Sequence, residues 1–94
     1  MRNVIISLID KLIIPKYDSI SYGVVHTNDL YKFNNKTGYS VTYTNFPPDS
    51  EEEIIKLTEM ILKSLGLSKV HKSYHGLTLT TLFDNSVIQI VGED

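Results

Sequence analysis

The sequence predicts an α+β fold in which a largely antiparallel sheet of four to five strands carries two helices on one face. Two segments, one near the N-terminus and one in the middle of the chain, repeat apolar residues at helical spacing. Several shorter segments alternate apolar and polar residues, which is typical of half-buried strands. Turn-forming clusters separate these segments, so we expect the order α-β-β-β-α-β-β within a single domain, residues 1–94.

The first predicted helix begins at Asn3, whose side chain suits a helix start, and ends before Pro15, which disfavours helical geometry in the residue preceding it. Its core-facing residues recur three and four positions apart: Ile5, Leu8, Ile9, Leu12 and Ile13. The helix also carries apolar residues that are hard to bury in so small a core, namely Val4, Ile6 and Ile14. We therefore expect a homodimer that forms through this helix.

Three strands are expected between the two helices, arranged as an antiparallel meander. The first covers 19–27 and is separated from the second, 30–34, by the turn-forming pair at 28–29. A turn at 35–38 leads to the third strand, 39–46, in which Tyr and Val alternate with Ser and Thr.

The second helix is expected over 51–65. Ser50 and Glu53 have the spacing of a capping box, and Gly66 suits the position just after a helix end. The core-facing stripe again repeats at helical spacing: Ile54, Leu57, Thr58, Ile61 and Leu65.

The last third of the chain predicts two or three strands: 76–83 and 87–91 form a hairpin with a turn at 84–86, and 67–74 is a further segment that can be extended. A weak internal repeat offers an alternative layout. In each half, a helix is followed by a Ser-Tyr pair with a glycine close behind, a strand, an Asn/Asp turn and another strand. Two α-β-β units of this kind would form a pseudosymmetric sheet with both helices on one face.

The composition excludes several classes of protein. The chain has no cysteine, so disulfides, thiolate metal sites and cysteine nucleophiles are absent. The apolar run from Val4 to Ile9 is interrupted by Asp10 and Lys11 and is too short to cross a bilayer. We therefore expect a cytoplasmic protein with no membrane segment, and the sequence indicates no cofactor.

The segment HKSYH, residues 71–75, places two histidines four positions apart. On a helix this spacing suits zinc, but Gly76 and the β-forming residues nearby favour an extended segment between the second helix and the final hairpin. An extended chain separates the two imidazoles by about 13 Å, too far for one ion, so we predict no metal site. We expect a solvent-accessible contact segment in which Tyr74 is the anchor, while Lys69 and Lys72 attract an acidic partner.

The segment 69–75 also supports an alternative function, nucleic-acid binding, because lysines bind phosphates and tyrosine stacks on bases. Two lysines are few for this purpose, and the chain's one arginine is Arg2. Catalysis has less support, since no serine lies in a nucleophile elbow and no glycine-rich phosphate loop occurs. We therefore expect that the protein is not an enzyme.

An acidic cluster marks the start of the second helix, over 49–59. Acidic proteins of phages can imitate DNA phosphates, so this cluster is a candidate partial DNA mimic with Glu52 and Glu59 as contact residues. Each of these glutamates has a lysine four positions later, Lys56 and Lys63, and this spacing favours a solvated helix face that pairs its own charges.

Six tyrosines are many for a chain of 94 residues. Tyrosine is enriched in protein interfaces, so Tyr39 is a further candidate contact residue, whereas Tyr43 and Val41 are expected in the core. The absence of alanine and the abundance of isoleucine, lysine and asparagine are typical of AT-rich genes, including those of many phages. The sequence thus predicts a non-catalytic protein-binding module, an inhibitor of phage or mobile-element origin that binds a host protein.

Overall fold

The computed structural model describes residues 1–30, 36–67, 69–78 and 84–94, and it describes only the backbone of 27–30, 36, 69–78 and 84–86. Two α-β-β units follow one another along the chain. The first contains α1 (Arg2–Leu12), β1 (Ser21–Leu30) and β2 (Lys36–Thr44). The second contains α2 (Glu51–Ser64), β3 (Lys69–Thr78) and β4 (Asp84–Glu93). The predicted α+β class, with two helices and an antiparallel sheet, is confirmed.

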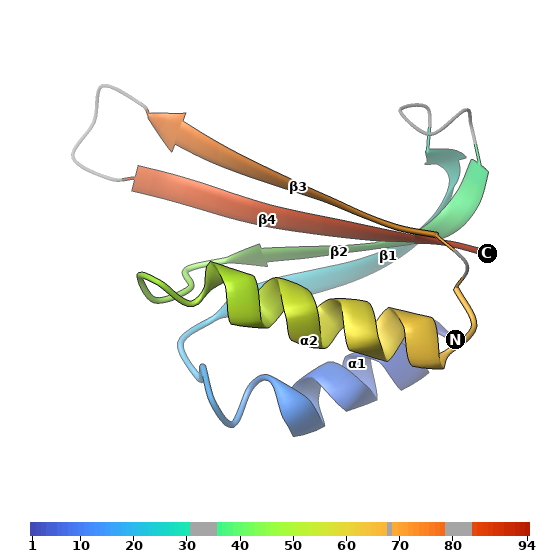
Figure 1. Cartoon of the computed structure of the whole chain (residues 1–94), viewed down its shortest axis with the longest axis horizontal. Coiled ribbons are helices and arrows are strands. Elements are labelled where there is room, and N and C mark those ends of the chain that lie inside the picture. The colour runs from blue at the N-terminus through green and yellow to red at the C-terminus, as the bar shows by residue number, and fades with distance from the viewer. Residues whose placement is uncertain (31–35, 68, 79–83) are drawn as a thin grey trace.

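The strands form one antiparallel sheet in the order β1-β2-β4-β3. The second strand of each unit therefore lies in the centre of the sheet, and the first strand of each unit lies at an edge. Both helices cover the same face of this sheet (Figure 1). This is the layout that the internal repeat predicts. The additional strand that the sequence predicts at 30–34 lies outside the described residues except for Leu30, which belongs to β1.

Asn and Asp residues lie inside strands at two places where the sequence predicts turns. Asn28 and Asp29 belong to β1, where the pairing with β2 shifts register between Thr27 and Leu30. Residues 84–86 belong to β4 and pair in register with Gly76, Leu77 and Thr78 of β3. The predicted turns at 28–29 and 84–86 are therefore wrong. At 84–86, pairing with β3 overrides the weak β-propensity of Asn and Asp, whereas 28–29 are accommodated at the register shift within β1.

Helix α1 is held in place by its contacts with the sheet. Ile5 and Ile9 are fully buried, and Arg2 Nε donates a hydrogen bond to the carbonyl of Val24 on β1 at 2.7 Å. The N-cap residue is Met1, which makes no side-chain capping hydrogen bond. The predicted cap at Asn3 is therefore wrong, because contacts with the sheet stabilise the first turn without one.

Helix α2 begins at Glu51, as its sequence predicts, and its C-terminal end also agrees with the sequence, but Ser50 does not make the predicted capping hydrogen bond. Gly66 has a φ of +82°, and its amide donates to the carbonyl of Lys63, as expected for the residue after a helix end. At the start, Ser50 is the N-cap without a capping hydrogen bond, because its hydroxyl donates instead to the carbonyl of Pro47 at 2.6 Å. The predicted capping box is therefore wrong, and Glu53 is left to bind other side chains.

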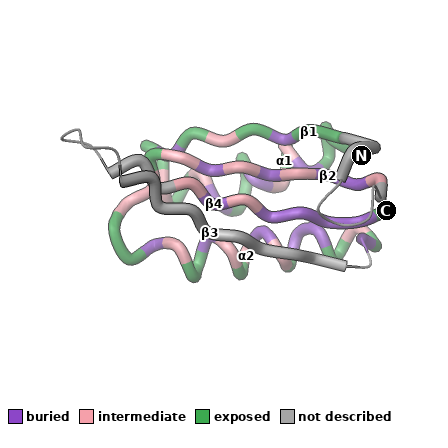
Figure 2. Tube along the Cα trace, turned by 90° about the horizontal axis from the view of Figure 1, so that it is seen from above, coloured by how far each residue is buried: buried purple, intermediate pink, exposed green. Residues whose placement is uncertain are grey.

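The core fills the layer between the helices and the central strands, where Figure 2 shows the buried residues gathered along β2 and β4. Its largest fully buried side chain is Tyr43, and Val41 is also fully buried, so the predicted core placement of both is confirmed. The Tyr43 hydroxyl lies 2.6 Å from Oγ1 of Thr58. Because Thr58 donates its own proton to the carbonyl of Ile54 at 2.8 Å, Tyr43 is the donor in this pair. Burial raises the pKa of Tyr43 far above its ordinary value.

Candidate functional site

The segment 71–75 lies within β3, so its backbone is extended as predicted. It belongs to the first strand of the final hairpin instead of preceding it, because β3 pairs with β4 along its whole length. The backbone of His71 is opposite Val91 and that of His75 is opposite Val87, and four residues of strand correspond to about 13 Å. The side chains of three predicted contact residues lie outside the described residues: Lys69, Lys72 and Tyr74.

Tyr39 is a core residue. Only 9% of its surface is exposed, and its ring packs against that of His26 with 4.5 Å between the ring centroids. His26 in turn places Nε2 3.2 Å from Oδ2 of Asp94. Strand alternation puts Tyr39 on the same side of β2 as Val41 and Tyr43, the side that faces the helices. The prediction that Tyr39 is a surface contact is therefore wrong. Among the side chains that the structure describes, no group of three His, Asp or Glu residues could hold a metal ion.

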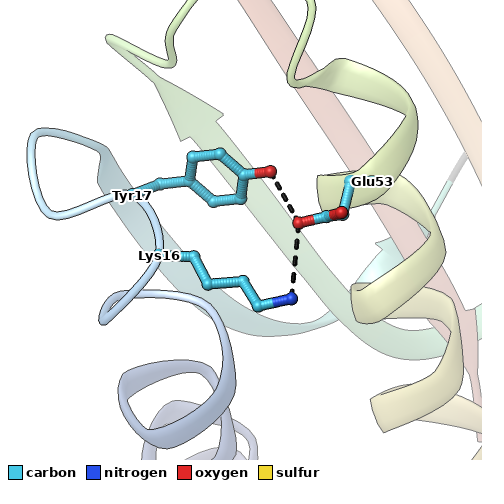
Figure 3. A network of polar contacts seen from close by, with 3 residues as sticks. All are labelled: Lys16, Tyr17 and Glu53. Carbon is cyan, nitrogen blue, oxygen red and sulfur yellow. Dashed lines mark hydrogen bonds and ion pairs between the residues drawn. The ribbon is translucent and has the colours of Figure 1, made fainter.

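The acidic start of α2 is partly neutralised by the residues that follow α1. Glu53 Oε1 accepts a hydrogen bond from the Tyr17 hydroxyl at 2.6 Å and lies 3.6 Å from Nζ of Lys16 (Figure 3). The hydrogen bond from Tyr17, followed by the charge of Lys16, lowers the pKa of Glu53. Glu53 therefore connects the first turn of α2 to the residues that follow α1.

The two acidic residues predicted to make contacts, Glu52 and Glu59, lie on the outer surface of α2. Glu52 is exposed and Glu59 is half-buried. With Ile55 and Lys56 they line a shallow depression. Lys56 thus interrupts the row of carboxylates at its centre, so this surface combines both charges with an apolar side chain.

A strip of apolar residues runs along the side of α1 that faces α2. Arg2 and Asp10 both contact β1: Arg2 donates to the carbonyl of Val24, and Asp10 accepts from the hydroxyl of Tyr22. Successive helical residues are rotated by about 100°, which places Val4, Leu8 and Leu12 on the side opposite Arg2 and Asp10. Val4 and Leu12 each expose 45% of their surface, and Leu8 is partly buried against the core.

Leu57 and Met60 continue this strip on α2. The two helices run antiparallel (Figure 1), and the contact between Tyr17 and Glu53 fixes their relative position. Leu57 and Met60 follow Glu53 by about one and two helical turns, so they lie on the same side of α2, toward α1. Met60 is 58% exposed and Leu57 is partly buried. We call the following five residues the helix-pair strip: Val4, Leu8, Leu12, Leu57 and Met60.

Lysines border the helix-pair strip on both sides. Lys11 lies on the outer flank of α1, Lys56 and Lys63 lie on the outer flank of α2, and all three are exposed. Within the described part of the chain none of these three forms an ion pair, whereas Lys16 pairs with Glu53. The strip is therefore an apolar surface whose nearest exposed charges, other than the paired Glu53, are lysines, with Glu52 and Glu59 farther out beside Lys56.

The surplus apolar residues predicted on α1 coincide only in part with this strip. Ile6 and Ile14 are half-buried and pack against the core, so the prediction that they remain as surplus surface is wrong. Val4 is exposed as expected. Sequence reasoning assigns Leu12 to the core and overlooks Met60, although the spacing of four from Val4 through Leu8 to Leu12 is a signal for a second apolar stripe.

No protein-family model, curated protein or solved structure matches this chain. No helix in the described ranges has the length and apolar character needed to cross a membrane. Function is therefore inferred from the contacts and charges of the chain itself.

Proposed function

We propose that this chain is a non-catalytic protein-binding module that contacts its partner through the helix-pair strip. The observation that carries this proposal is the placement of the exposed apolar residues. Among the described side chains, the exposed large apolar residues other than Val25 lie on or next to α1 and α2: Met1, Val4, Leu12 and Met60. Apolar residues that gather on one face of a small protein mark interaction sites, whereas single scattered ones do not.

The opposite face of the sheet supports the proposal by contrast. Along β2, the polar residues Ser40, Thr42 and Thr44 alternate with the buried side that faces the helices. Gln89 of β4 donates from Nε2 to Oγ of Ser40 at 3.0 Å. Among the side chains described on this face, Val25 is the one large exposed apolar residue, whereas four lie on or next to the two helices.

The groups with shifted pKa values are explained by contacts between elements of the fold. Burial, followed by a hydrogen bond to Asp10, raises the pKa of Tyr22 to about 12. The hydrogen bond between Tyr17 and Glu53 raises the pKa of the tyrosine and lowers that of the glutamate. Each pair joins a helical segment to another element, and we assign no catalytic step to these groups.

The partner expected from the composition is a host protein, and the chain acts as an inhibitor by occupying the surface of that protein. Three baits test this: the wild type, Met60→Glu in the strip, and Val25→Glu on β1. Val25 is a matched control because it is 58% exposed, as Met60 is, and receives the same new charge. We expect the wild-type and Val25→Glu baits to capture a host protein that Met60→Glu does not capture. The same protein, once purified, should bind the wild type directly. Capture that is equal for all three baits contradicts the proposal.

A second candidate function is nucleic-acid binding through 69–75, a segment with two lysines and a tyrosine that lies on the edge strand β3. Binding of this kind releases counterions and weakens steeply with salt. A salt titration with labelled DNA and RNA distinguishes the two functions. The absence of binding at low salt removes this candidate and leaves the first.

A further inference from the structure

We infer that the segment seated on the helix-pair strip is an acidic amphipathic helix of the partner. This inference rests on the proposed protein-binding function and specifies the chemistry of what is bound. It follows from the charges that border the strip, from the length of the strip, and from the poorer fit of other occupants.

The charges around the strip select an acidic partner. Lys11 borders it on the α1 side, and Lys56 and Lys63 border it on the α2 side. Two carboxylates of the same helices are already engaged, because Asp10 and Glu53 each accept a hydrogen bond from a tyrosine hydroxyl. Glu52 and Glu59 lie beside Lys56, but the helical rotation of about 100° per residue places them farther around α2 from Met60 than Lys56 and Lys63 are. Carboxylates on both flanks of a bound helix would therefore meet ammonium groups on both sides, which favours correct partners and fast association.

The length of the strip matches a short helix. Val4 and Leu12 are eight residues apart, which is about 12 Å along the helix axis. A partner helix with apolar residues at i, i+4 and i+7 presents a stripe of about 10 Å. Such a stripe can pack over the partly buried Leu8 and Leu57 as a third helix on this layer. An extended peptide fits less well, because helices offer it no backbone edge to pair with.

A second copy of the chain is a poorer occupant, although it would realise the homodimer predicted through α1. In a two-fold dimer the same patch meets itself, so Lys11, Lys56 and Lys63 would approach the same three lysines of the other copy. An anionic membrane surface is also a poorer occupant. Glu52 and Glu59 lie beside Lys56 on α2, and the whole chain carries a net charge of −2.

A pair of synthetic peptides tests the inference. Both are helices of about four turns with leucines at i, i+4, i+7 and i+11, and the residues that flank the leucines are glutamate in one peptide and lysine in the other. Fluorescence anisotropy measures the Kd of each peptide for the wild type, Met60→Glu and Val25→Glu. Circular dichroism melting confirms that all three proteins are folded, which we expect because exposed substitutions have small effects.

We expect the glutamate peptide to bind the wild type and Val25→Glu equally, and Met60→Glu about tenfold more weakly. The lysine peptide should bind the wild type at least about tenfold more weakly than the glutamate peptide does. The triple change of Lys11, Lys56 and Lys63 to glutamine should remove this preference. Equal affinity for both peptides, undiminished binding to Met60→Glu, or no binding of either peptide overturns the inference.

Two further outcomes overturn it in favour of another occupant. One is a wild-type dimer in light scattering that Met60→Glu converts to a monomer, which identifies a second copy. The other is binding to phosphatidylserine vesicles that Met60→Glu abolishes. If only the acidic-helix inference is wrong, neither peptide binds, but a host protein is still captured by the wild type and not by Met60→Glu. Failure of the proposed function shows instead as capture that does not depend on Met60.

Discussion

The two α-β-β units have the same order of elements, but each fastens its helix to the sheet in a different way. In the first unit, polar side chains on one flank of α1 reach the edge strand β1. Arg2 donates to the carbonyl of Val24, and the Tyr22 hydroxyl donates to Asp10. These contacts lie at an exposed or partly buried edge, where hydrogen bonds contribute modestly to stability because water competes for the same groups.

In the second unit, close packing fastens the end of α2 to the central strand β4. The amide of Leu67 donates to the carbonyl of Leu62 at 3.2 Å, which together with the bond made by Gly66 completes a Schellman motif. Both leucines are buried and lie over Gly92 of β4. A Cβ added to Gly92 would come within 2.9 Å of Leu67 Cδ1 and 3.4 Å of Leu62 Cδ1.

The attachment of α1 to β1 explains why Val4 and Leu12 of the first unit remain exposed. The β1 side of α1 is occupied by Arg2 and Asp10, and its sheet side by buried isoleucines. Val4 and Leu12 are left on a third side that no described element covers fully. A helix that is attached to the sheet by hydrogen bonds from one side can therefore expose apolar residues on another side without weakening the core.

The seam between the units should be the region least tolerant of substitution. A Cβ on Gly38 of β2 would collide with the backbone carbonyl oxygen of Gly92 on β4, which cannot move without disturbing the strand pairing. We expect Gly38→Ala to lower the free energy of unfolding by about 2–3 kcal/mol. Gly23→Ala on the edge strand β1 meets no atom within 4 Å and should change it by less than about 0.5 kcal/mol. Equal effects in urea denaturation would contradict the contrast between centre and edge.

The buried hydrogen bond that joins β2 to α2 should be the next most sensitive feature. Thr58→Val leaves the Tyr43 hydroxyl without its acceptor and should cost about 2 kcal/mol. Tyr43→Phe removes the donor but leaves Thr58 bonded to the carbonyl of Ile54, so it should cost only about 1 kcal/mol. The double variant should lose less than the two single losses combined. Additive losses in thermal or urea unfolding would show that the hydroxyls do not interact.

The edge of the first unit should respond to Arg2→Ala mainly by self-association. The variant should lose less than about 1 kcal/mol of stability, but it uncovers the carbonyl of Val24 on the edge strand, and uncovered edges pair with other chains. Light scattering at increasing concentration measures the effect. Lys11→Ala, which removes a charge from the same helix without touching the edge, should behave as the wild type. An Arg2→Ala protein that associates no more than Lys11→Ala contradicts this account of the edge.

The two tyrosine–carboxylate pairs should respond differently to loss of the carboxylate. The hydrogen bond to Glu53 is the largest cause of the raised pKa of Tyr17, so Glu53→Gln should return that pKa nearly to its ordinary value of 10.0. Burial is the largest cause for Tyr22, so Asp10→Asn should lower its pKa only part of the way from about 12. NMR titration of ring-labelled tyrosine measures both. If the two tyrosine pKa values fall by the same amount, the raised pKa has the same main cause at Tyr17 and Tyr22, which contradicts this prediction.

The sign of the resulting pH dependence follows from the directions of these shifts. The lowered pKa of Glu53 means that its contribution to stability is present above its ordinary pKa of 4.5 and is lost as the pH falls through the lowered value. The raised pKa of Tyr17 means that its contribution is present below 10.0 and is lost as the pH rises through the raised value. Glu53→Gln should remove both dependences together.

The sequence predicts features that depend on neighbours along the chain. Helical spacing identifies the buried residues Ile5 and Ile9 of α1 and Ile54 and Ile61 of α2, and the conformation of a helix end requires Gly66. Strand ends are predicted less well, because pairing with a partner strand decides them, as at 84–86.

The candidate site depends on contacts between elements that the sequence alone does not place. Strand alternation groups Tyr39 with Tyr43, but it does not say which side of the strand the helices cover. Likewise, Leu12 and Met60 have helical spacing that suits either core or surface. Only the contacts of Arg2 and Asp10 with β1, and of Glu53 with Tyr17, decide which sides of the two helices remain exposed.

The most direct test of the helix-pair strip uses the methionine methyl groups. The chain has two methionines, Met1 and Met60, so protein labelled with ¹³C at these methyls gives a spectrum in which Met60→Leu identifies the Met60 signal. On titration with the purified host protein that the wild-type bait retains, we expect the Met60 signal to shift or broaden in proportion to the bound fraction. If that protein binds while the Met60 signal stays unchanged, the contact lies elsewhere and the helix-pair strip is not the binding surface.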